Sequence, residues 1–306
     1  MRAGLFFAYM ADMKRKNEKI SVAIQGVVGS FHEIAAVEYF RGREICPVPC
    51  ETFTDLFTVL EEGKTDYGIV AFENSVAGSI LPNYELLRRS RLTVTGEICL
   101  RVIQNLVALP GQRMSDIREI HSHPIAIQQC SVFINEMREK GVKVVEASDT
   151  ALSARLISEK RHFGAGAIAS SSAAGMYSLA ILKKEIEDNR LNFTRFIMIA
   201  GNGKHITGQD TAVNTDKAMV CFSLPHKVGS LSQVLSVLAY YQISLTRIQS
   251  IPIIGQPWEY LFHIDLIYSD YNRYRQALDA IRPLTEGLEV LGEFMHGLMP
   301  DEAGNN

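Results

Sequence analysis

Two short polar segments that adjoin apolar runs most constrain what this chain can fold into. Residues 73–79 (ENSVAGS) follow an apolar run at 67–72. Residues 192–196 (NFTRF) lead into a second apolar run that ends at Ala200. Apolar runs of this length, bounded by turn residues, are typical of buried strands in an α/β sheet. Polar groups at strand ends are where such folds bind ligands, so the two segments predict a site assembled from distant parts of the chain.

The chain up to about residue 200 alternates short apolar strands with helices. Ser30 precedes the first helix as its predicted N-cap, with Glu33 as its capping-box partner. The strand–helix–strand order predicts a parallel sheet with crossover helices, and two α/β lobes with a cleft between them are the simplest packing. The predicted strands lie at 21–24, 68–72, 120–122, 142–145 and 166–169, and the predicted helices at 31–41, 54–62, 126–140 and 150–160.

A smaller domain is predicted after a polar, glycine-containing linker at 201–216. Alternation of Trp258, Tyr260 and Phe262 indicates a strand, and Leu231 begins an apolar pattern on one helical face. Strands are predicted at 217–224, 243–253, 257–267 and 288–294, with helices near 231–238 and 271–282. The order β-α-β-β-α-β is ferredoxin-like. The predicted fold class is α/β, with a two-lobed domain and this second domain.

Composition excludes several classes of function. A formal net charge of −3 and 21% charged residues give no reason to expect nucleic acid or a membrane surface as a partner. No run approaches the roughly 20 apolar residues that span a bilayer. Five scattered cysteines, an odd number, predict reduced thiols in a cytoplasmic protein. Cys46 and Cys50 lack a second ligand pair at zinc spacing, and Pro47 and Pro49 favour an extended strand there, so no metal is expected.

Five motifs, in order along the chain, resemble those of the prephenate dehydratase family. Residues 73–78 (ENSVAG) and 194–196 (TRF) are similar to its two signature motifs. The other stretches that resemble the family are the glycine turn at 26–31, the segments 122–124 and 128–130, and an ACT domain over 217–266. The resemblance runs from about residue 21 to about residue 294. It implies a two-lobed, periplasmic-binding-protein-like catalytic domain followed by a regulatory ACT domain.

The resemblance implies conversion of prephenate to phenylpyruvate with loss of carbon dioxide and water, without metal, cofactor or covalent nucleophile. The family motif assigns Thr194 to proton donation. A departing carboxylate loses its charge, so neutral donors suit it, and Arg195 is expected to bind the pyruvyl carboxylate or to hold the lobes together. The expected catalytic residues are Thr194, Asn74, Gln129 and Ser122. The expected substrate-binding residues are Ser75, Gly78, Gly29, Ser30, His123, Ser170, Arg195 and Phe196.

The resemblance also implies feedback inhibition by L-phenylalanine bound to the ACT domain. Residues 249–252 depart from the family pattern, because they read QSIP where the family has ESRP. Loss of both charges removes an ion pair, and an ACT domain that only dimerises the chain remains an alternative. Exposed apolar surface on the ACT sheet predicts a homodimer or homotetramer. The expected effector-binding residues are Gly229, Ser230, Leu231, Ser244, Leu245, Gln249 and Ser250.

Two other functions fit the same residues. Arogenate carries an amino group in place of the keto oxygen of prephenate, and nothing in the sequence excludes it as substrate. A catalytically silent amino-acid-binding regulator is the other alternative. The stretch before Ser21 is too short for a helical chorismate mutase domain, so a monofunctional enzyme is expected. The expected boundaries are an extension at 1–20, a catalytic domain at 21–200 (lobes at about 21–97 with 183–200, and 98–182), the linker at 201–216, the ACT domain at 217–296 and a tail at 297–306.

Overall fold

A computed structural model describes residues 19–201, 215–253, 255–256 and 258–297. The chain divides into two compact units, Met1–Ser79 with Cys99–Phe196 and Ile80–Ile98 with Ile197–Asn306. The expected N-terminal extension, linker and C-terminal tail lie almost wholly outside the described residues, and the domain boundaries stay predictions. Within the described part of the chain, no helix is both long and apolar enough to cross a membrane.

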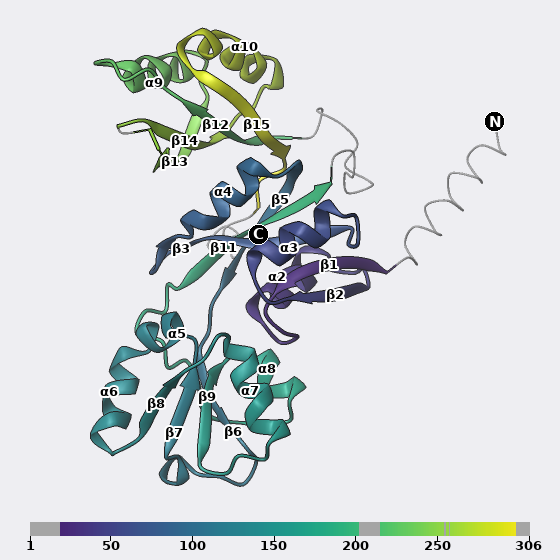
Figure 1. Ribbon diagram of the computed structural model, residues 1–306, viewed down its shortest axis with the longest axis vertical. Helices are drawn as coiled ribbons and strands as arrows, with labels where there is room; N and C mark the ends of the chain where they lie inside the picture. The colour runs from purple at the N-terminus through teal and green to yellow at the C-terminus, as the bar shows by residue number, and fades with distance from the viewer. Residues whose placement is uncertain (1–18, 202–214, 254, 257, 298–306) are drawn as a thin grey trace, which may run out of the picture. The chain divides into compact units, whose positions relative to one another are not determined.

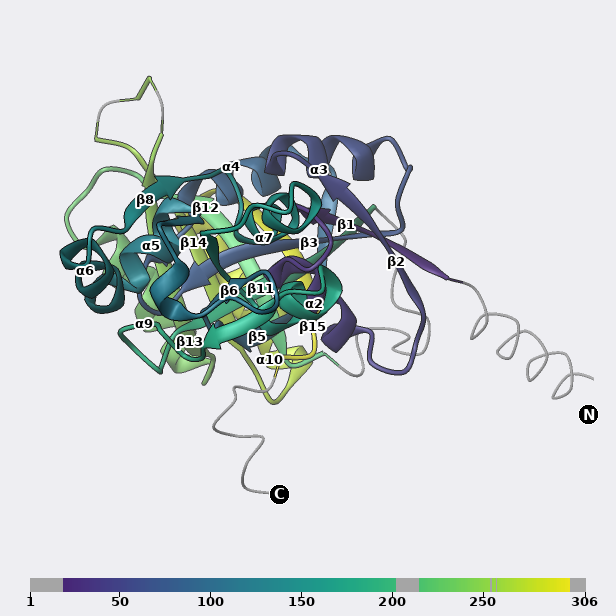
Figure 2. The ribbon, with the colours of Figure 1, turned by 90° about the horizontal axis from the view of Figure 1, so that it is seen from below.

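A strand–helix–strand–helix–strand segment opens the first unit. The elements of its sheet and their helices are β1 (Ile20–Gln25), α2 (Phe31–Tyr39), β2 (Ile45–Cys50), α3 (Phe53–Glu61), β3 (Tyr67–Asn74), β4 (Gly78–Ser79), β5 (Leu92–Arg101) and β11 (Phe193–Gly201). The sheet has the order β2-β1-β3-β11-β5, with β4 paired to β3; the part of β5 up to Ile98 and the part of β11 from Ile197 are counted with the second unit. β1 runs parallel to β2 and β3, and α2 and α3 lie on opposite faces of these strands (Figure 2). The predicted parallel pairing with crossover helices is confirmed.

Two sequence signals in this segment are also confirmed. The Ser30 hydroxyl caps α2 by accepting a hydrogen bond from the Glu33 backbone N–H, as predicted, but the predicted capping box does not form, because the Glu33 carboxylate accepts the N–H of Gly29 and not that of Ser30. Pro47 and Pro49 lie in β2, which is an edge strand. Proline is tolerated at a sheet edge because an outward N–H has no ladder partner to lose.

A second sheet, with its own two layers of helices, makes up the rest of the first unit. Its elements are β6 (Asn105–Ala108), a 3₁₀ turn (Met114–Asp116), β7 (Glu119–Ser122), α5 (Pro124–Gln129), α6 (Ser131–Glu139), β8 (Lys143–Glu146), α7 (Thr150–Glu159), β9 (Ala165–Ala169), α8 (Ser171–Met176) and β10 (Ala180–Lys183). The strand order is β10-β6-β9-β7-β8. β7 pairs in parallel with β8 and β9, whereas β6 is antiparallel to β9 and β10. Figure 1 shows α5 and α6 on one face of this sheet and α7 and α8 on the other.

The prediction of one continuous helix over 126–140 was wrong, because α5 ends at Gln129 and α6 begins at Ser131. The physical cause is Asp188, whose carboxylate accepts the backbone N–H groups of Ser131 and Val132 at 2.8 and 3.0 Å. These N–H groups would otherwise bond within a continuous helix. The cap starts a second helix and leaves Gln129 at a free helix end.

The second unit contains the predicted ferredoxin-like fold. Its elements are β12 (Lys217–Ser223), α9 (Ser230–Tyr240), β13 (Ser244–Pro252), β14 (Tyr260–Ile267), α10 (Tyr271–Ile281), a 3₁₀ turn (Arg282–Leu284) and β15 (Glu286–Phe294). The sheet is antiparallel with the order β13-β14-β12-β15. The predicted strand over 257–267 starts too early: Trp258 lies outside β14, has φ +69° and is 74% exposed.

One helix of the second unit, α4 (Leu81–Arg89), was not predicted. Figure 1 shows it on the face of the β13-β14-β12-β15 sheet opposite α9 and α10. The ring of Tyr84 contacts His263 of β14 with centroids 5.0 Å apart, and Arg247 lies over the same ring. Burial lowers the pKa of His263 to about 4, so this imidazole is neutral near pH 7. On the same unit, the buried Lys217 ammonium contacts both oxygens of Glu97 at 2.8 and 2.9 Å.

We expect Gly292→Ala to destabilise the second unit. A methyl group at Gly292 would lie 2.1 Å from the carbonyl oxygen of Val94, a backbone atom with no freedom to turn aside. The overpacking should lower the free energy of unfolding by about 1–3 kcal/mol, measured as a lower calorimetric midpoint. Gly201→Ala is the matched control, because its methyl group would meet no described atom within 4 Å. An equal loss of unfolding free energy in the two variants would contradict the close approach of Gly292 to Val94.

Candidate functional site

Three amide side chains from separate parts of the first unit form a closed ring of hydrogen bonds. Asn74 ends β3, Gln129 ends α5, and Asn192 immediately precedes β11. Asn74 Nδ2 donates to Asn192 Oδ1 at 2.7 Å, Asn192 Nδ2 donates to Gln129 Oε1 at 3.0 Å, and Gln129 Nε2 donates to Asn74 Oδ1 at 3.3 Å. All three side chains are buried. Each amide therefore both gives and receives a bond, which offsets the cost of burying it.

Thr194 is held by the same ring. It lies two residues after Asn192, so the alternation of an extended chain places both side chains on one side. Asn74 Nδ2 also donates to Thr194 Oγ1 at 2.9 Å. A hydroxyl has one proton to give and two lone pairs that accept. Because Asn74 occupies an acceptor position, the proton of Thr194 is directed away from Asn74.

The turn after β3 is locked to the strand that carries Thr194. Asn74 Oδ1 accepts the backbone N–H groups of Val76 and Ala77 at 3.0 and 2.7 Å. The Ser75 hydroxyl donates to the carbonyl of residue 191 at 2.6 Å and accepts the N–H of residue 193 at 2.9 Å. The two signature segments are therefore tied to each other through side chains as well as through the pairing of β3 with β11.

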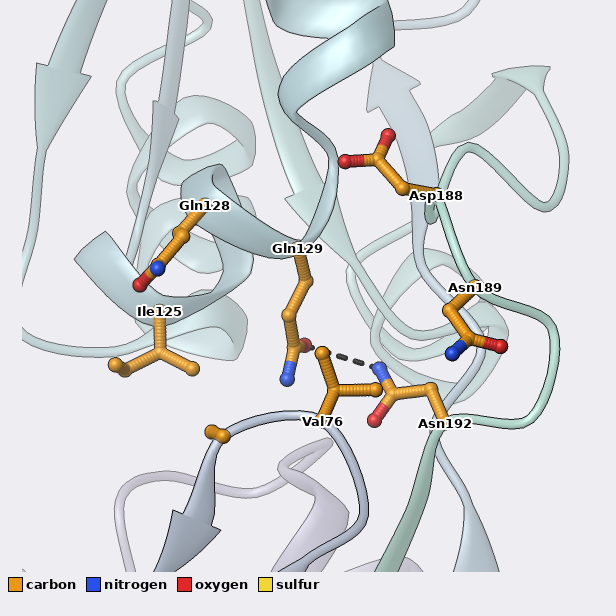
Figure 3. A pocket seen from close by; sticks show the side chains of 8 residues that line it. Val76, Ile125, Gln128, Gln129, Asp188, Asn189 and Asn192 are labelled. Atoms are coloured by element: carbon orange, nitrogen blue, oxygen red, sulfur yellow. Dashed lines mark hydrogen bonds between the residues drawn. The ribbon is translucent and has the colours of Figure 1, made fainter.

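A pocket of about 150 Å³ lies beside the amide ring (Figure 3). Gln129 and Asn192 face each other at its wall, joined by the hydrogen bond drawn in the figure. The carboxylate in this pocket, Asp188, is engaged in capping α6. The lining residues are Val76, Ala77, Ile125, Gln128, Gln129, Asp188, Asn189 and Asn192. Apart from Asp188, the lining is neutral, so it presents amides and apolar groups to a ligand.

The Gly29–Ser30 turn makes a different set of contacts. Ser170 Oγ donates to the Gly29 carbonyl at 3.0 Å, and a methyl group on Gly29 would lie 3.1 Å from Ala173 Cα. Gly29 has φ +92°, so both conformation and space require glycine. The Ser170 hydroxyl also caps α8 by accepting the N–H of Ala173. These bonds join the β1–α2 turn to α8, and a role in substrate binding stays a prediction.

Ser122 and His123 already have structural hydrogen bonds. The buried Ser122 hydroxyl donates to the Ile168 carbonyl at 2.9 Å. His123 is the N-cap of α5, and its Nδ1 accepts the N–H of Ile125 at 3.2 Å. The catalytic role of Ser122 and the substrate contact of His123 therefore stay predictions.

Arg195 and Phe196 follow Thr194 in β11. Arg195 is half-buried, while the Phe196 ring is fully buried with its centroid 5.1 Å from that of His32. Burial lowers the pKa of His32 to about 3. This imidazole is therefore uncharged near neutral pH, and its contact with Phe196 is one of packing.

The expected effector residues lie on two elements of the second unit. Gly229 precedes α9 with φ +83°, and the Ser230 hydroxyl donates to the Pro225 carbonyl at 2.9 Å. Leu231 lies in the first turn of α9. The remaining residues lie on the edge strand β13 and are Ser244, Leu245, Gln249 and Ser250.

Asn192 is the residue of the ring that sequence reasoning missed as part of the site. The motif containing it was identified, but only Thr194, Arg195 and Phe196 were assigned roles. The two-residue spacing between Asn192 and Thr194 was the available signal, since it places both side chains on one side of an extended chain. Asp188 and Asn189 had no such signal, because they reach the pocket through a loop.

We expect Asn192→Ala to destabilise the first unit by about 1–3 kcal/mol, because Asn74 and Gln129 each lose a buried partner. The measurement is the thermal midpoint of the purified protein. Asn189→Ala, the same change at an exposed position three residues away, is the control and should leave the midpoint nearly unchanged. A ring that contributes nothing to stability would give the same small shift in both.

Comparison with known proteins places this geometry in a family. A family model for prephenate dehydratase matches residues 22–204. Arogenate dehydratase 2 from Petunia hybrida is 34% identical over 302 residues, which cover 94% of this chain and 74% of that protein. The solved structure of GqqA, described as a novel type of quorum-quenching acylase, has a TM-score of 0.79 at 27% identity and covers 92% of this chain and 99% of its own. Prephenate dehydratase from Arthrobacter aurescens in complex with L-Phe has a TM-score of 0.77 at 26% identity, with 90% of each chain covered. Since the family model matches more than half of its residues, this chain belongs to the prephenate dehydratase family.

Proposed function

We propose that this chain is a carbon–oxygen lyase that converts prephenate to phenylpyruvate, carbon dioxide and water in L-phenylalanine biosynthesis. The observation that carries the proposal is the buried Thr194 hydroxyl, which accepts a hydrogen bond from Asn74, so that its own proton is directed away from Asn74. Membership of the family supplies the substrate. Loss of a hydroxyl group requires a donor at the departing oxygen, and Thr194 is such a donor.

In the proposed reaction, the bond between the ring carbon and its hydroxyl breaks as the ring carboxylate releases the electrons of its carbon–carbon bond. The ring becomes aromatic, the carboxylate leaves as carbon dioxide, and the hydroxyl takes up one proton to leave as water. General-acid assistance of this kind contributes about 10²–10⁴ in rate. A threonine hydroxyl is a weak acid, but the N–H of Asn74 stabilises negative charge that develops on Oγ1 as the proton is shared.

The neutral amides beside Thr194 suit the departing carboxylate. Its charge disappears as carbon dioxide forms, so a cation held against it would stabilise the ground state more than the transition state. Gln129, whose Nε2 gives one N–H to Asn74 and keeps a second, provides a hydrogen bond without such a charge. Arg195 follows Thr194 on β11, and adjacent side chains on a strand point to opposite faces, so its expected contact with the pyruvyl carboxylate, or a role in holding the lobes together, stays a prediction.

Arogenate remains a second candidate substrate, because a relative that is 34% identical is named an arogenate dehydratase. The amino group of arogenate is remote from the ring hydroxyl, so the chemistry at Thr194 would be the same for both substrates. Acyl transfer, the activity in the name of GqqA, is less well supported. Nucleophilic attack by Thr194 needs a base to take its proton, whereas the groups that hold it are amides.

We expect Thr194→Val to slow single-turnover formation of phenylpyruvate from prephenate by about 10²–10⁴, because valine has the same shape without the proton. Thr194→Ser keeps the donor and should stay within about tenfold of the unmodified protein. The control is Thr58→Val, the same change at an exposed position of α3. Undiminished chemistry in Thr194→Val would remove the assignment, and a parallel assay with arogenate decides between the two substrates.

We further propose the arrangement of the whole chain around this activity. Residues 21–200 form the catalytic domain, and residues 217–296 form an ACT domain that binds L-phenylalanine as a feedback inhibitor. A relative solved in complex with L-Phe supports the effector. The edge position of β13 favours pairing with a second copy of the chain, giving a homodimer or a homotetramer. Free cysteines favour a cytoplasmic location.

We expect Gly229→Ala to weaken L-phenylalanine binding by at least about tenfold, because φ +83° at the start of α9 strains any residue with a side chain. Isothermal titration measures binding, and inhibition of phenylpyruvate formation measures its effect. Gly63→Ala, at another glycine with positive φ and open space, is the matched control. A chain that turns over prephenate but neither binds nor responds to L-phenylalanine would leave the domain with a role in assembly alone.

A further inference from the structure

Two histidines and one carboxylate converge on the sheet of the first unit, outside the amide ring. Glu119 and His121 lie in β7, and His162 lies in the loop after α7. The three ligand atoms are all within 4.8 Å of one another. Glu119 Oε1 is 2.8 Å from His121 Nε2 and 3.3 Å from His162 Nε2. None of the hydrogen bonds described above for the candidate functional site involves these three residues.

The backbone fixes all three residues. Glu119 and His121 are two apart on a strand paired on both sides, so their side chains share one face. His162 follows a Schellman motif at the end of α7: its N–H bonds to Ile157 O at 3.0 Å, and the N–H of Arg161 bonds to Ser158 O at 3.2 Å.

The loop that carries His162 is also hydrogen-bonded to β7. The carbonyl of Gly164 accepts the N–H of Glu119 at 3.2 Å, two residues beyond His162. The two ligand-bearing segments are therefore held together by main-chain bonds whether or not the side chains meet. A site whose backbone is already held in place loses little side-chain and loop freedom when it binds a ligand.

We propose that Glu119, His121 and His162 bind one zinc ion, with water in the fourth position. Neutral imidazoles and a carboxylate are ligands that zinc prefers, and three of them with an open position complete its tetrahedron. Bonds of about 2.0–2.1 Å place tetrahedral ligand atoms about 3.3–3.4 Å apart. The separation of Glu119 from His162 already has this value, and that of Glu119 from His121 needs to open by only about 0.5 Å.

Local charge favours a cation. Glu119 supplies an anionic ligand between the two imidazoles. The site lies just past the C-terminus of α7, where the helix dipole attracts positive charge. Lys143, paired with Glu119 in register on β8, works against a cation. Because Lys143 is exposed, its charge is screened by solvent and only weakens the binding.

The bound ion would tie α7 to the strand that leads into the substrate site. Ser122 follows His121 directly, and α5, which carries Gln129, begins two residues later at Pro124. The ion itself would contact only the opposite face of β7 from Ser122, since adjacent residues on a strand point to opposite faces. Its expected effect is therefore on stability, with basal turnover unchanged.

The test is isothermal titration of the full chain with zinc chloride under reducing conditions. We expect one more equivalent of zinc in the unmodified protein than in His162→Gln, and at least about tenfold weaker binding in Glu119→Gln. Zinc taken up by exposed thiols such as Cys46 is common to all variants and cancels in the difference. His226→Gln, at an exposed histidine elsewhere, should keep the full stoichiometry.

Zinc should also raise the thermal midpoint of the unmodified protein and of His226→Gln, but not of His162→Gln. Equal stoichiometry in the unmodified protein and His162→Gln would overturn the proposal. Loss of prephenate turnover in metal-free His162→Gln would contradict a site separate from the amide ring. Because these readouts are binding and stability, they stand whether or not the proposed dehydratase activity is found.

Discussion

The closed ring of hydrogen bonds among Asn74, Gln129 and Asn192 is the interaction on which the rest of the site depends. A buried amide without a partner costs about 1–3 kcal/mol. Three amides that satisfy one another avoid this cost only in one relative arrangement. The ring therefore fixes how the end of β3, the end of α5 and the start of β11 lie against each other. It also orients Asn74 so that Thr194 accepts, which decides the direction of the Thr194 proton.

Hydrogen bonds at the ends of elements position two members of the ring. Asn74 bonds the turn that follows it, and Asp188 stops α5 from running into α6, so that Gln129 stands at a helix end. Ser30 and Ser170 do the same for the turns at α2 and α8. Helix caps of this kind are worth about 1 kcal/mol each. Here their larger effect is geometric, because they decide which side chains stand at the ends of elements.

The second unit shows how one segment of sequence joins a distant fold. α4 follows directly on the segment that contains Asn74 and Gly78, yet it packs on the sheet of β12 to β15. The buried pair of Lys217 and Glu97 adds a second tie in the same unit. The chain therefore passes from β4 of the first unit into α4 of the second without an intervening loop of any length. This continuity gives the proposed L-phenylalanine control a short covalent route.

Local patterns were enough to determine the fold class, the ferredoxin-like order of the last six elements, the cap at Ser30 and the two segments that carry Asn74 and Thr194. Each of these depends on periodicity or on turn chemistry within a few residues, which a single sequence displays directly. Three features were not evident from the sequence, because each depends on a partner that lies far away along the chain. The break between α5 and α6 depends on Asp188, and the helix α4 depends on the β12–β15 sheet. The place of Asn192 in the site depends on Gln129. The three zinc-ligand candidates were missed for the same reason, since His162 is 41 residues from His121 along the chain. The sequence by itself therefore determined which chemical groups the chain carries. Only the tertiary structure decided which of them meet, in the hydrogen-bonded amide ring with Thr194 and in the proposed zinc site.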